Sequence, residues 1–214
     1  MQPDLLPSAI GAGAARLGVA LDDRQLRQLA DYVALLERWN SVHNLTAVRR
    51  GEDVLTHHLL DSLALVPHLD RVTGGAAADV LDVGSGGGLP GIVLAVAAPK
   101  AQLTLVEAVQ KKCAFLTQAR LELGLDNVAV RHHRVETLQA GPFDVIVSRA
   151  LTTLAQFVAW TRHLLRPQGC WLAMKGKRPT EELAQLPADV RVEVIAQRVP
   201  ELDEERHVIE MRIR

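Results

Sequence analysis

Hydrophobic residues in the N-terminal third of the chain recur at the spacing of a helix. Over residues 22–39 the apolar positions repeat every three or four residues, which predicts an amphipathic helix with Asp22 or Asp23 as its cap. A second helical pattern covers residues 52–69 and is followed by a glycine pair that breaks it. We therefore expect residues 1–75 to form a helical cap.

From residue 76 onward, short apolar runs alternate with longer helical patterns. This alternation favours a parallel sheet covered by helices on both faces. The expected strands are residues 80–83, 103–107, 128–131, 143–148, 171–175, 190–199 and 207–213, and the expected helices are residues 90–98, 110–123 and 154–165. A Pro167-Gln168-Gly169 turn is expected to separate the last of these helices from its strand. No helix separates the last two strands, so we expect them to form an antiparallel hairpin at a sheet edge. Residues 76–214 are thus predicted to be an α/β core of seven strands, mostly parallel and doubly wound, forming one compact unit.

Composition limits the class of protein. The 214 residues are 48% hydrophobic, which is enough for a sizeable core. No apolar run approaches the length of a membrane span and no secretory signal is present, so we expect a cytoplasmic protein without a membrane partner. Cys113 and Cys170 lie in no metal-ligand spacing, and they are expected to be buried thiols.

Charge is unevenly distributed along the chain. The formal net charge is -1, yet residues 131–178 contain eight Lys or Arg against two acids, a local net of +6. Such a segment fits either a solvated surface or a site for a polyanion. Only 3% of residues are aromatic, which is too few for a platform on which successive bases stack.

Residues 79–91 combine a predicted strand with a glycine-rich loop. Several adjacent glycines allow a sharp turn and bring backbone N–H groups against a ligand. From Gly86 the loop matches G-x-G-x-x-G, with Glu107 at the distance where a dinucleotide-binding protein places its ribose acid, so NAD is one candidate cofactor. Asp82 to Gly88 is similar to the Asp-x-Gly-x-Gly-x-Gly of S-adenosylmethionine sites. No second substrate domain follows, which favours S-adenosylmethionine, and the order of elements resembles the Rossmann-like class I methyltransferases. No Gly-Lys-Ser/Thr follows the glycines, which excludes a P-loop.

The fourth predicted core strand ends in Val147-Ser148-Arg149-Ala150. It lacks the Pro-Cys used for methylating a pyrimidine carbon and the Asn/Asp-Pro-Pro-aromatic used for an exocyclic amine. An acceptor with its own exposed lone pair, such as guanine N7, needs positioning and no enzyme nucleophile. Arg149 can stack on a purine, bridge to a phosphate or hold the cofactor carboxylate. Carboxyl and small-molecule acceptors would look similar and stay open at this point.

Several motifs together carry a family resemblance. They are Trp39-Asn40, Asn44-Leu45-Thr46, His58 with Asp61-Ser62-Leu63, residues 82–91, Lys111-Lys112 with Phe115-Leu116, Arg134-Val135-Glu136, Phe143-Asp144, Ser148-Arg149-Ala150, Lys175-Gly176 and Glu205-Arg206-His207. In this combination the chain resembles the bacterial small-subunit ribosomal RNA guanine-N7 methyltransferases once called glucose-inhibited division protein B. The resemblance implies methylation of 16S ribosomal RNA at guanine 527, within the small ribosomal subunit or its precursor, by a monomer.

The motif and the resemblance together give a set of expected site residues. Arg149 is the expected catalytic residue. The expected cofactor-binding residues are Asp82, Gly84, Gly86, Leu89, Glu107, Val135, Glu136 and Arg149, with Glu107 accepting from the ribose hydroxyls. The expected RNA-binding residues are Lys111, Arg134, Lys175 and Arg206. His57, His58 and Asp61 recur at helical spacing, but no third kind of ligand is apparent, so we expect no metal. The remaining alternatives are a non-catalytic RNA-binding module and an NAD-dependent oxidoreductase.

Overall fold

The helical cap is built from several short helices and one long one. The computed structural model describes residues 5–45 and 51–214, and only the main chain of Gly51 and Glu52. The helices of the cap are α1 (Leu6–Arg16), α2 (Asp23–His43), α3 (Gly51–Val54), the π-helical turn η2 (Leu55–Leu60), α4 (Asp61–Leu63) and α5 (Val66–Thr73). Thr46, which belongs to one of the motifs of the family resemblance, lies outside the described residues.

The predicted cap of the long helix is confirmed. The Asp22 side chain accepts a hydrogen bond from the Gln25 N–H at 2.8 Å, and the Gln25 side chain accepts one from the Asp22 N–H at 2.9 Å. This reciprocal pair satisfies two donors that a helix start leaves unbonded. The pattern of residues 52–69 forms no single helix, because η2 and a break before α5 divide it.

Helix α1 was not predicted from the sequence, because its Gly- and Ala-rich residues show little apolar periodicity. Its small residues permit a close approach to η2. A Cβ atom on Gly13 would lie 2.5 Å from Leu60 Cδ2, which is closer than van der Waals contact allows. Helix α1 can therefore pack against η2 because Gly13 has no side chain. A pattern of apolar side chains cannot reveal such a contact.

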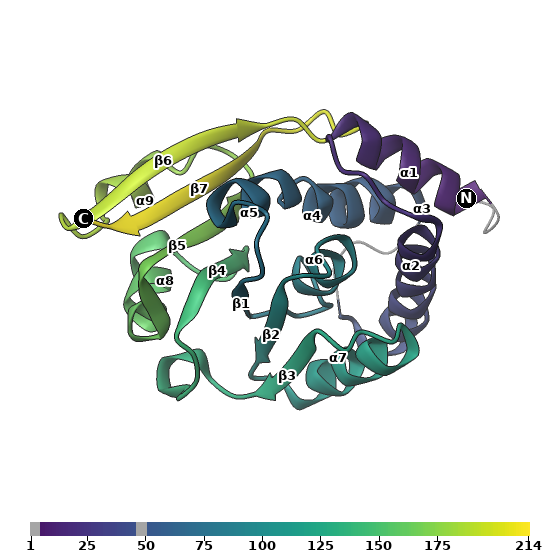
Figure 1. Ribbon diagram of the computed structural model, residues 1–214, viewed down its shortest axis with the longest axis horizontal. Coiled ribbons are helices and arrows are strands. Elements are labelled where there is room, and N and C mark those ends of the chain that lie inside the picture. Colours follow the sequence, from purple (N-terminus) through teal and green to yellow (C-terminus); the bar gives the residue numbers. More distant parts are fainter. Residues whose placement is uncertain (1–4, 46–50) are drawn as a thin grey trace.

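The core is one seven-stranded sheet in the order β3-β2-β1-β4-β5-β7-β6 (Figure 1). The strands are β1 (Asp79–Val83), β2 (Gln102–Glu107), β3 (Val128–His132), β4 (Phe143–Arg149), β5 (Leu165–Lys175), β6 (Val190–Gln197) and β7 (Arg206–Ile213). Strands β1 to β5 pair in parallel, whereas β7 runs antiparallel to both β5 and β6. The expected α/β fold class, with its antiparallel C-terminal hairpin, is confirmed.

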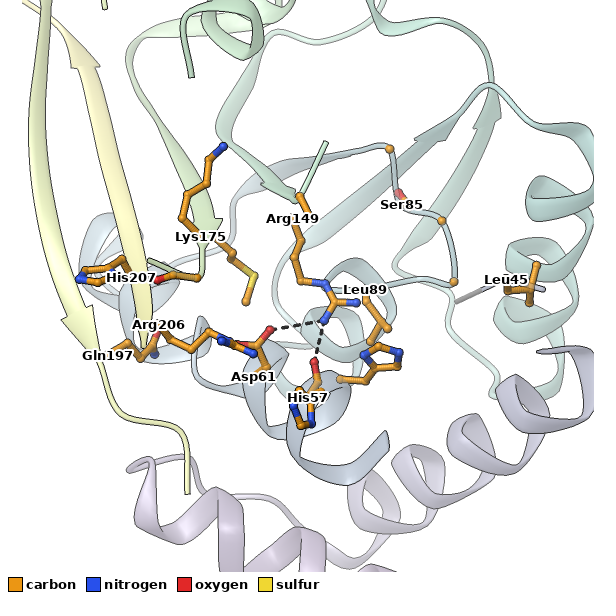
Figure 2. Close-up of a pocket in the computed structure, with 17 residues that line it drawn as sticks. Leu45, His57, Asp61, Ser85, Leu89, Arg149, Lys175, Gln197, Arg206 and His207 are labelled. Carbon is orange, nitrogen blue, oxygen red and sulfur yellow. Dashed lines mark hydrogen bonds and ion pairs between the residues drawn. The ribbon is translucent and has the colours of Figure 1, made fainter. Parts of the chain in front are cut away.

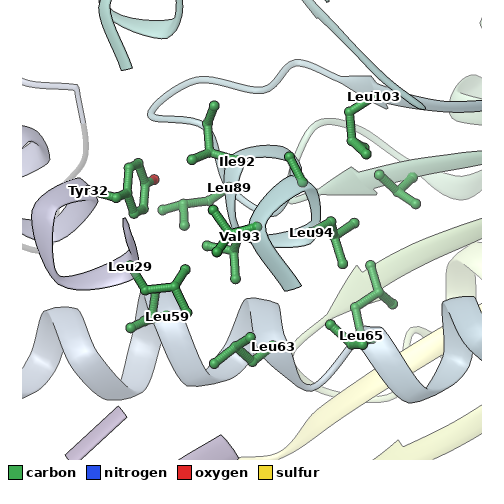
Figure 3. Packing of buried hydrophobic residues seen from close by; sticks show 14 of the residues in the cluster. Leu29, Tyr32, Leu59, Leu63, Leu65, Leu89, Ile92, Val93, Leu94 and Leu103 are labelled. Carbon is green, nitrogen blue, oxygen red and sulfur yellow. The ribbon is translucent and has the colours of Figure 1, made fainter. Parts of the chain in front are cut away.

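Helices cover both faces of the sheet. Helices α6 (Gly91–Ala97) and α7 (Gln110–Glu122) share one buried cluster with the helical cap, while α8 (Leu154–Thr161) packs in a second cluster with α9 (Thr180–Ala184) beside it. Alternate strand residues enter the two clusters, as Val80 and Leu81 do, because side chains of a strand point to opposite faces. Figure 3 shows α2, the cap helices and α6 meeting through their apolar side chains. In the part of the chain that the structure describes, no helix combines the length and the apolar character that crossing a membrane requires.

The expected turn at residues 167–169 is wrong. Helix α8 ends at Thr161, a 3-10 turn η4 covers Arg162–Leu164, and β5 already begins at Leu165. Phe143 and Val145 of β4 face Leu165 and Cys170 of β5, so the proline and glycine form an irregular bulge inside the strand. Proline and glycine are tolerated in strands at such bulges.

Candidate active site

The glycine loop between β1 and α6 has a conformation that requires glycine. Gly84, Gly86 and Gly88 have φ angles of +70°, +55° and +86°, a region that L side chains rarely adopt. A Cβ atom on Gly84 would also lie 2.5 Å from Leu151 Cδ1. The main chain is therefore exposed to a ligand at the point where β1 ends.

Asp82, at the end of β1, stabilises this loop from the interior of the protein. Its side chain is fully buried, and Oδ2 accepts a hydrogen bond from the Gly91 N–H at 3.0 Å. Burial raises the pKa of the Asp82 carboxyl to about 7. A dinucleotide would place its pyrophosphate at this start of α6. The Asp82 carboxylate already binds the first helical N–H there, which speaks against the NAD hypothesis.

Tyr32 of α2 fixes the same loop from the cap. Its hydroxyl, which is buried, donates a hydrogen bond of 2.5 Å to the Gly87 carbonyl. Burial raises the pKa of Tyr32 well above its ordinary value, so the hydroxyl stays a donor. Sequence reasoning did not identify this residue, because nothing in the helical pattern distinguishes it from a core aromatic.

A cavity of about 460 Å³ opens between the glycine loop, the helical cap and β7, and we call it the cap cavity. Its lining residues are Leu45, His57, His58, Asp61, Gly84, Ser85, Gly86, Gly87, Leu89, Arg149, Ala150, Met174, Lys175, Gly176, Gln197, Arg206 and His207. A neighbouring cavity of about 340 Å³, the β3 cavity, lies at the carboxyl ends of β2 and β3. Its lining residues are Val83, Gly84, Val106, Glu107, Ala108, Lys112, His133, Arg134, Val135, Glu136, Arg149, Ala150, Leu151 and Trp160. Gly84, Arg149 and Ala150 line both cavities, so the two meet at the carboxyl ends of β1 and β4.

Glu107 is the buried acidic residue of the β3 cavity. The residue is 7% exposed. Its Oε2 accepts a hydrogen bond from the Gly86 N–H at 3.0 Å, and its Oε1 accepts one from the Val109 N–H at 2.9 Å. A carboxylate offers about four acceptor sites, so Glu107 keeps capacity for a further pair of donors. Arg134, Val135 and Glu136 line the same cavity, as the resemblance implied.

Arg149 reaches from the end of β4 into the cap cavity, where two groups anchor it. Its Nη1 donates to the His57 carbonyl at 2.9 Å and lies 3.4 Å from Asp61 Oδ2 (Figure 2). The π-helical turn makes the carbonyl contact possible. The N–H of Asp61 bonds to the carbonyls of Thr56 and His58 instead of the His57 carbonyl that an α-helix would use.

Asp61 joins Arg149 to a second arginine. Its other oxygen, Oδ1, lies 3.2 Å from Arg206 Nε at the start of β7. Only 8% of the Asp61 side chain is exposed. Burial raises the pKa of the Asp61 carboxyl, while the charges of Arg149 and Arg206 act in the opposite direction. From the sequence, Asp61 is a motif residue of the family resemblance and a rejected metal ligand, and nothing there predicts its contact with two arginines.

The structure brings most of the expected site residues to the two cavities. The cap cavity is lined by Gly86, Leu89, Lys175 and Arg206, and the β3 cavity by Glu107, Arg134, Val135 and Glu136. Gly84 and Arg149 line both. Asp82 and Lys111 line neither. Asp82 lies beneath the loop, and Lys111 donates to the His43 carbonyl at the surface. Among the described residues, no group of three or more His, Cys, Asp or Glu side chains is arranged to hold a metal ion.

Comparison with known proteins decides the family. The family model described as rRNA small subunit methyltransferase G matches residues 25–209. This chain belongs to that family. A ribosomal RNA small subunit methyltransferase G of Burkholderia thailandensis is 54% identical over 98% of this chain and 93% of its own length. One of Acidovorax ebreus is 52% identical over 97% of this chain and 95% of its own length.

Comparison with solved structures identifies the fold of this member of the small subunit methyltransferase G family. An S-adenosylmethionine-dependent methyltransferase from Aquifex aeolicus has a TM-score of 0.57 and 19% identity, over 76% of this chain and 94% of that one. At this identity the match concerns the fold alone. The fold is that of the class I S-adenosylmethionine-dependent methyltransferases.

Proposed function

We propose that this protein transfers the methyl group of S-adenosylmethionine to guanine N7 of 16S ribosomal RNA. The observation that carries the proposal is the junction of two cavities at Gly84 and Arg149. One cavity contains a buried acid suited to ribose hydroxyls, and the other is open and lined by polar side chains that can face a base. Membership of the small subunit methyltransferase G family supports 16S ribosomal RNA as the substrate. The family resemblance of the motifs implies the guanine at position 527.

The residues present fit S-adenosylmethionine. The positive φ angles of the glycine loop expose main-chain groups to the cofactor, and Glu107 retains acceptor capacity after binding two N–H groups. Val135 and Glu136 line the part of the β3 cavity where the adenine would lie. When bound, the cofactor supplies a methyl group that its positive sulfur makes electrophilic.

The protein's part in the reaction is to position the base and to exclude water. Guanine N7 has an exposed lone pair, so no residue has to remove a proton before methyl transfer. Arg149 is fixed by His57 and Asp61 through Nη1 alone. Among the described residues, no group binds its Nε or Nη2, which leaves one edge of the guanidinium for the substrate. We assign that edge to guanine O6 or to the cofactor carboxylate, since a donor on N7 would block the lone pair.

The test uses small ribosomal subunits from cells that lack this methyltransferase. The purified protein with labelled S-adenosylmethionine should methylate them, and chain cleavage specific for N7-methylguanine should map the product. Arg149→Ala should lose most of this activity. Unchanged cofactor affinity in calorimetry would assign the free edge of Arg149 to the base, and weaker affinity would assign it to the cofactor carboxylate. If the unchanged protein binds the cofactor and the RNA without transferring label, it is a non-catalytic RNA-binding module. Label on another base or position would contradict the assigned acceptor.

A cytoplasmic monomer acting on the small subunit or its precursor is part of the same proposal. Sedimentation of the purified chain at several concentrations tests the oligomeric state. Parallel assays with naked 16S RNA, a precursor particle and the mature subunit identify the substrate.

A further inference from the structure

Among the described residues, every Lys and Arg side chain that lines the cap cavity forms an ion pair within the chain. Arg149 and Arg206 share Asp61, and Arg206 Nη1 also lies 2.9 Å from Glu204 Oε2. Lys175 Nζ lies 2.9 Å from Glu182 Oε2. The three Lys and Arg side chains that line the cavity in the described part of the chain are therefore paired with three carboxylates. For an enzyme that acts on RNA, such a charge-balanced cavity beside the glycine loop calls for an explanation.

Asp61 lies between Arg149 and Arg206 and bridges them. Its two oxygens contact one nitrogen of each arginine, at 3.4 and 3.2 Å. A phosphate bridges two guanidinium groups in the same manner, and arginine is a preferred partner of phosphate. Figure 2 shows Asp61 between the two arginines, with Lys175 extending away from it. With Asp61 absent, the two guanidinium groups would form an anion site on the wall of the cavity.

At the exposed edge of β3, by contrast, the arginine side chains are not paired with carboxylates of the described residues. Arg131 and Arg134 are exposed at the end of the strand, and neither forms an ion pair with any residue that the structure describes. A polyanion that approaches this face would meet Arg131 and Arg134, which have no ion-pair partner among the described residues. The described Lys and Arg side chains of the cap cavity are instead paired with carboxylates. The two surfaces are therefore suited to different parts of a nucleotide.

We propose that Asp61 is a specificity-determining residue that keeps backbone phosphate out of the cap cavity, so that the cavity accepts the uncharged base. The carboxylate acts as a built-in counterion, and it also holds Arg149 and Arg206 in place for the base. Discrimination of this kind works by making the wrong ligand unfavourable. The inference rests on the proposed function only in taking an RNA guanine as the base.

The first test needs no RNA. Binding of inorganic phosphate to the full-length protein is measured by calorimetry for the unchanged chain and for Asp61→Ala, which removes the carboxylate and leaves room for an anion. Asp61→Ala should bind phosphate at least about tenfold more tightly, the scale of one charge-assisted hydrogen bond. The matched control is Asp70→Ala on α5, an exposed position that loses the same charge outside both cavities. The affinity of each variant for S-adenosylmethionine shows that its cofactor site is folded.

If the alanine variant does not fold, the isosteric Asp61→Asn replaces it. This variant should also bind phosphate more tightly than the unchanged protein, but by a smaller factor than Asp61→Ala. The unchanged protein should keep its methylation rate in millimolar phosphate, whereas the Asp61 variants should be inhibited competitively with respect to the subunit. A folded Asp61 variant that gains no phosphate affinity would overturn the inference, as would competitive inhibition of the unchanged protein by phosphate. Absence of any methylation by the unchanged protein contradicts the proposed function instead, and it leaves the phosphate titration readable.

Discussion

Glu107 binds two main-chain N–H groups of the site and retains acceptor capacity in the β3 cavity. Hydrogen bonds to a charged group contribute about 1.5–3 kcal/mol each. Glu107→Gln keeps the shape and loses the charge, so we expect the dissociation constant for S-adenosylmethionine to rise about 10- to 100-fold. Calorimetry measures it, with Glu181→Gln on exposed α9 as the control. Equal affinities of the two variants would remove Glu107 from the cofactor site.

Asp82 gives a prediction about pH. Burial raises the pKa of its carboxyl from the ordinary 3.8 to about 7, so between these values the folded chain holds a proton that the unfolded chain has released. The contribution of Asp82 to the free energy of unfolding is therefore greatest below pH 4. It falls by up to about 4 kcal/mol as the pH rises to 7, at about 1.36 kcal/mol per pKa unit.

Asp82→Asn cannot ionise but still offers an acceptor to the Gly91 N–H. Urea unfolding at pH 5, 6, 7 and 8 should therefore show a smaller loss of stability with rising pH in this variant than in the unchanged protein. The control is Asp70→Asn, which changes an exposed aspartate of α5. Parallel pH profiles for Asp82→Asn and the unchanged protein would show that Asp82 ionises as an exposed residue does.

At the scale of elements, α2 and the glycine loop are coupled through one side chain. Tyr32→Phe removes the hydroxyl that binds the Gly87 carbonyl and keeps the buried ring. We expect a loss of about 1 kcal/mol in the free energy of unfolding and a several-fold weaker affinity for the cofactor, because the loop loses a fixed point. Thr73→Val also removes a hydroxyl bonded to a carbonyl, but on α5 away from the loop. It should affect stability alone, and calorimetry of both variants separates the two effects.

The π-helical turn is a second element whose geometry serves the site. Its His57 carbonyl binds Arg149, and its last residue precedes Asp61, so one irregular turn positions both anchors of the arginine. π-Turns often occur at functional sites. The apolar pattern of residues 52–69 continues through this turn without interruption, which is why a regular helix was expected there.

On the scale of the whole molecule, the uneven charge should appear in the salt dependence of RNA binding. Each phosphate contact changes the slope of log affinity against log salt by about 0.7–0.9. The double variant Arg131→Ala and Arg134→Ala should bind the small subunit more weakly, with a slope that is shallower by about 1–2. Filter binding across a salt series measures it, and Arg191→Ala on β6 is the control. An unchanged slope would show that the β3 edge does not contact RNA phosphates.

Much of the fold could be predicted because its signals are local. Strand and helix periods, the Asp22 cap and the late hairpin are properties of neighbouring residues, and each appears in the structure. The predicted turn at Pro167 failed because proline and glycine fit both a turn and a strand bulge, and only the pairing with β4 distinguishes them. Helix α1 escaped prediction because it packs through glycine.

In the site, too, some residues could be predicted from the sequence and others could not. The sequence by itself determined the glycine loop, the acid at Glu107 and the arginine at the end of β4, because each is tied to a strand end by its position in the chain. Only the tertiary structure decided that Asp61 lies between Arg149 and Arg206, which are 88 and 145 residues away from it, and that Tyr32 holds the loop. Contacts over such separations depend on how the cap packs against the sheet, and no local pattern of residues encodes that packing.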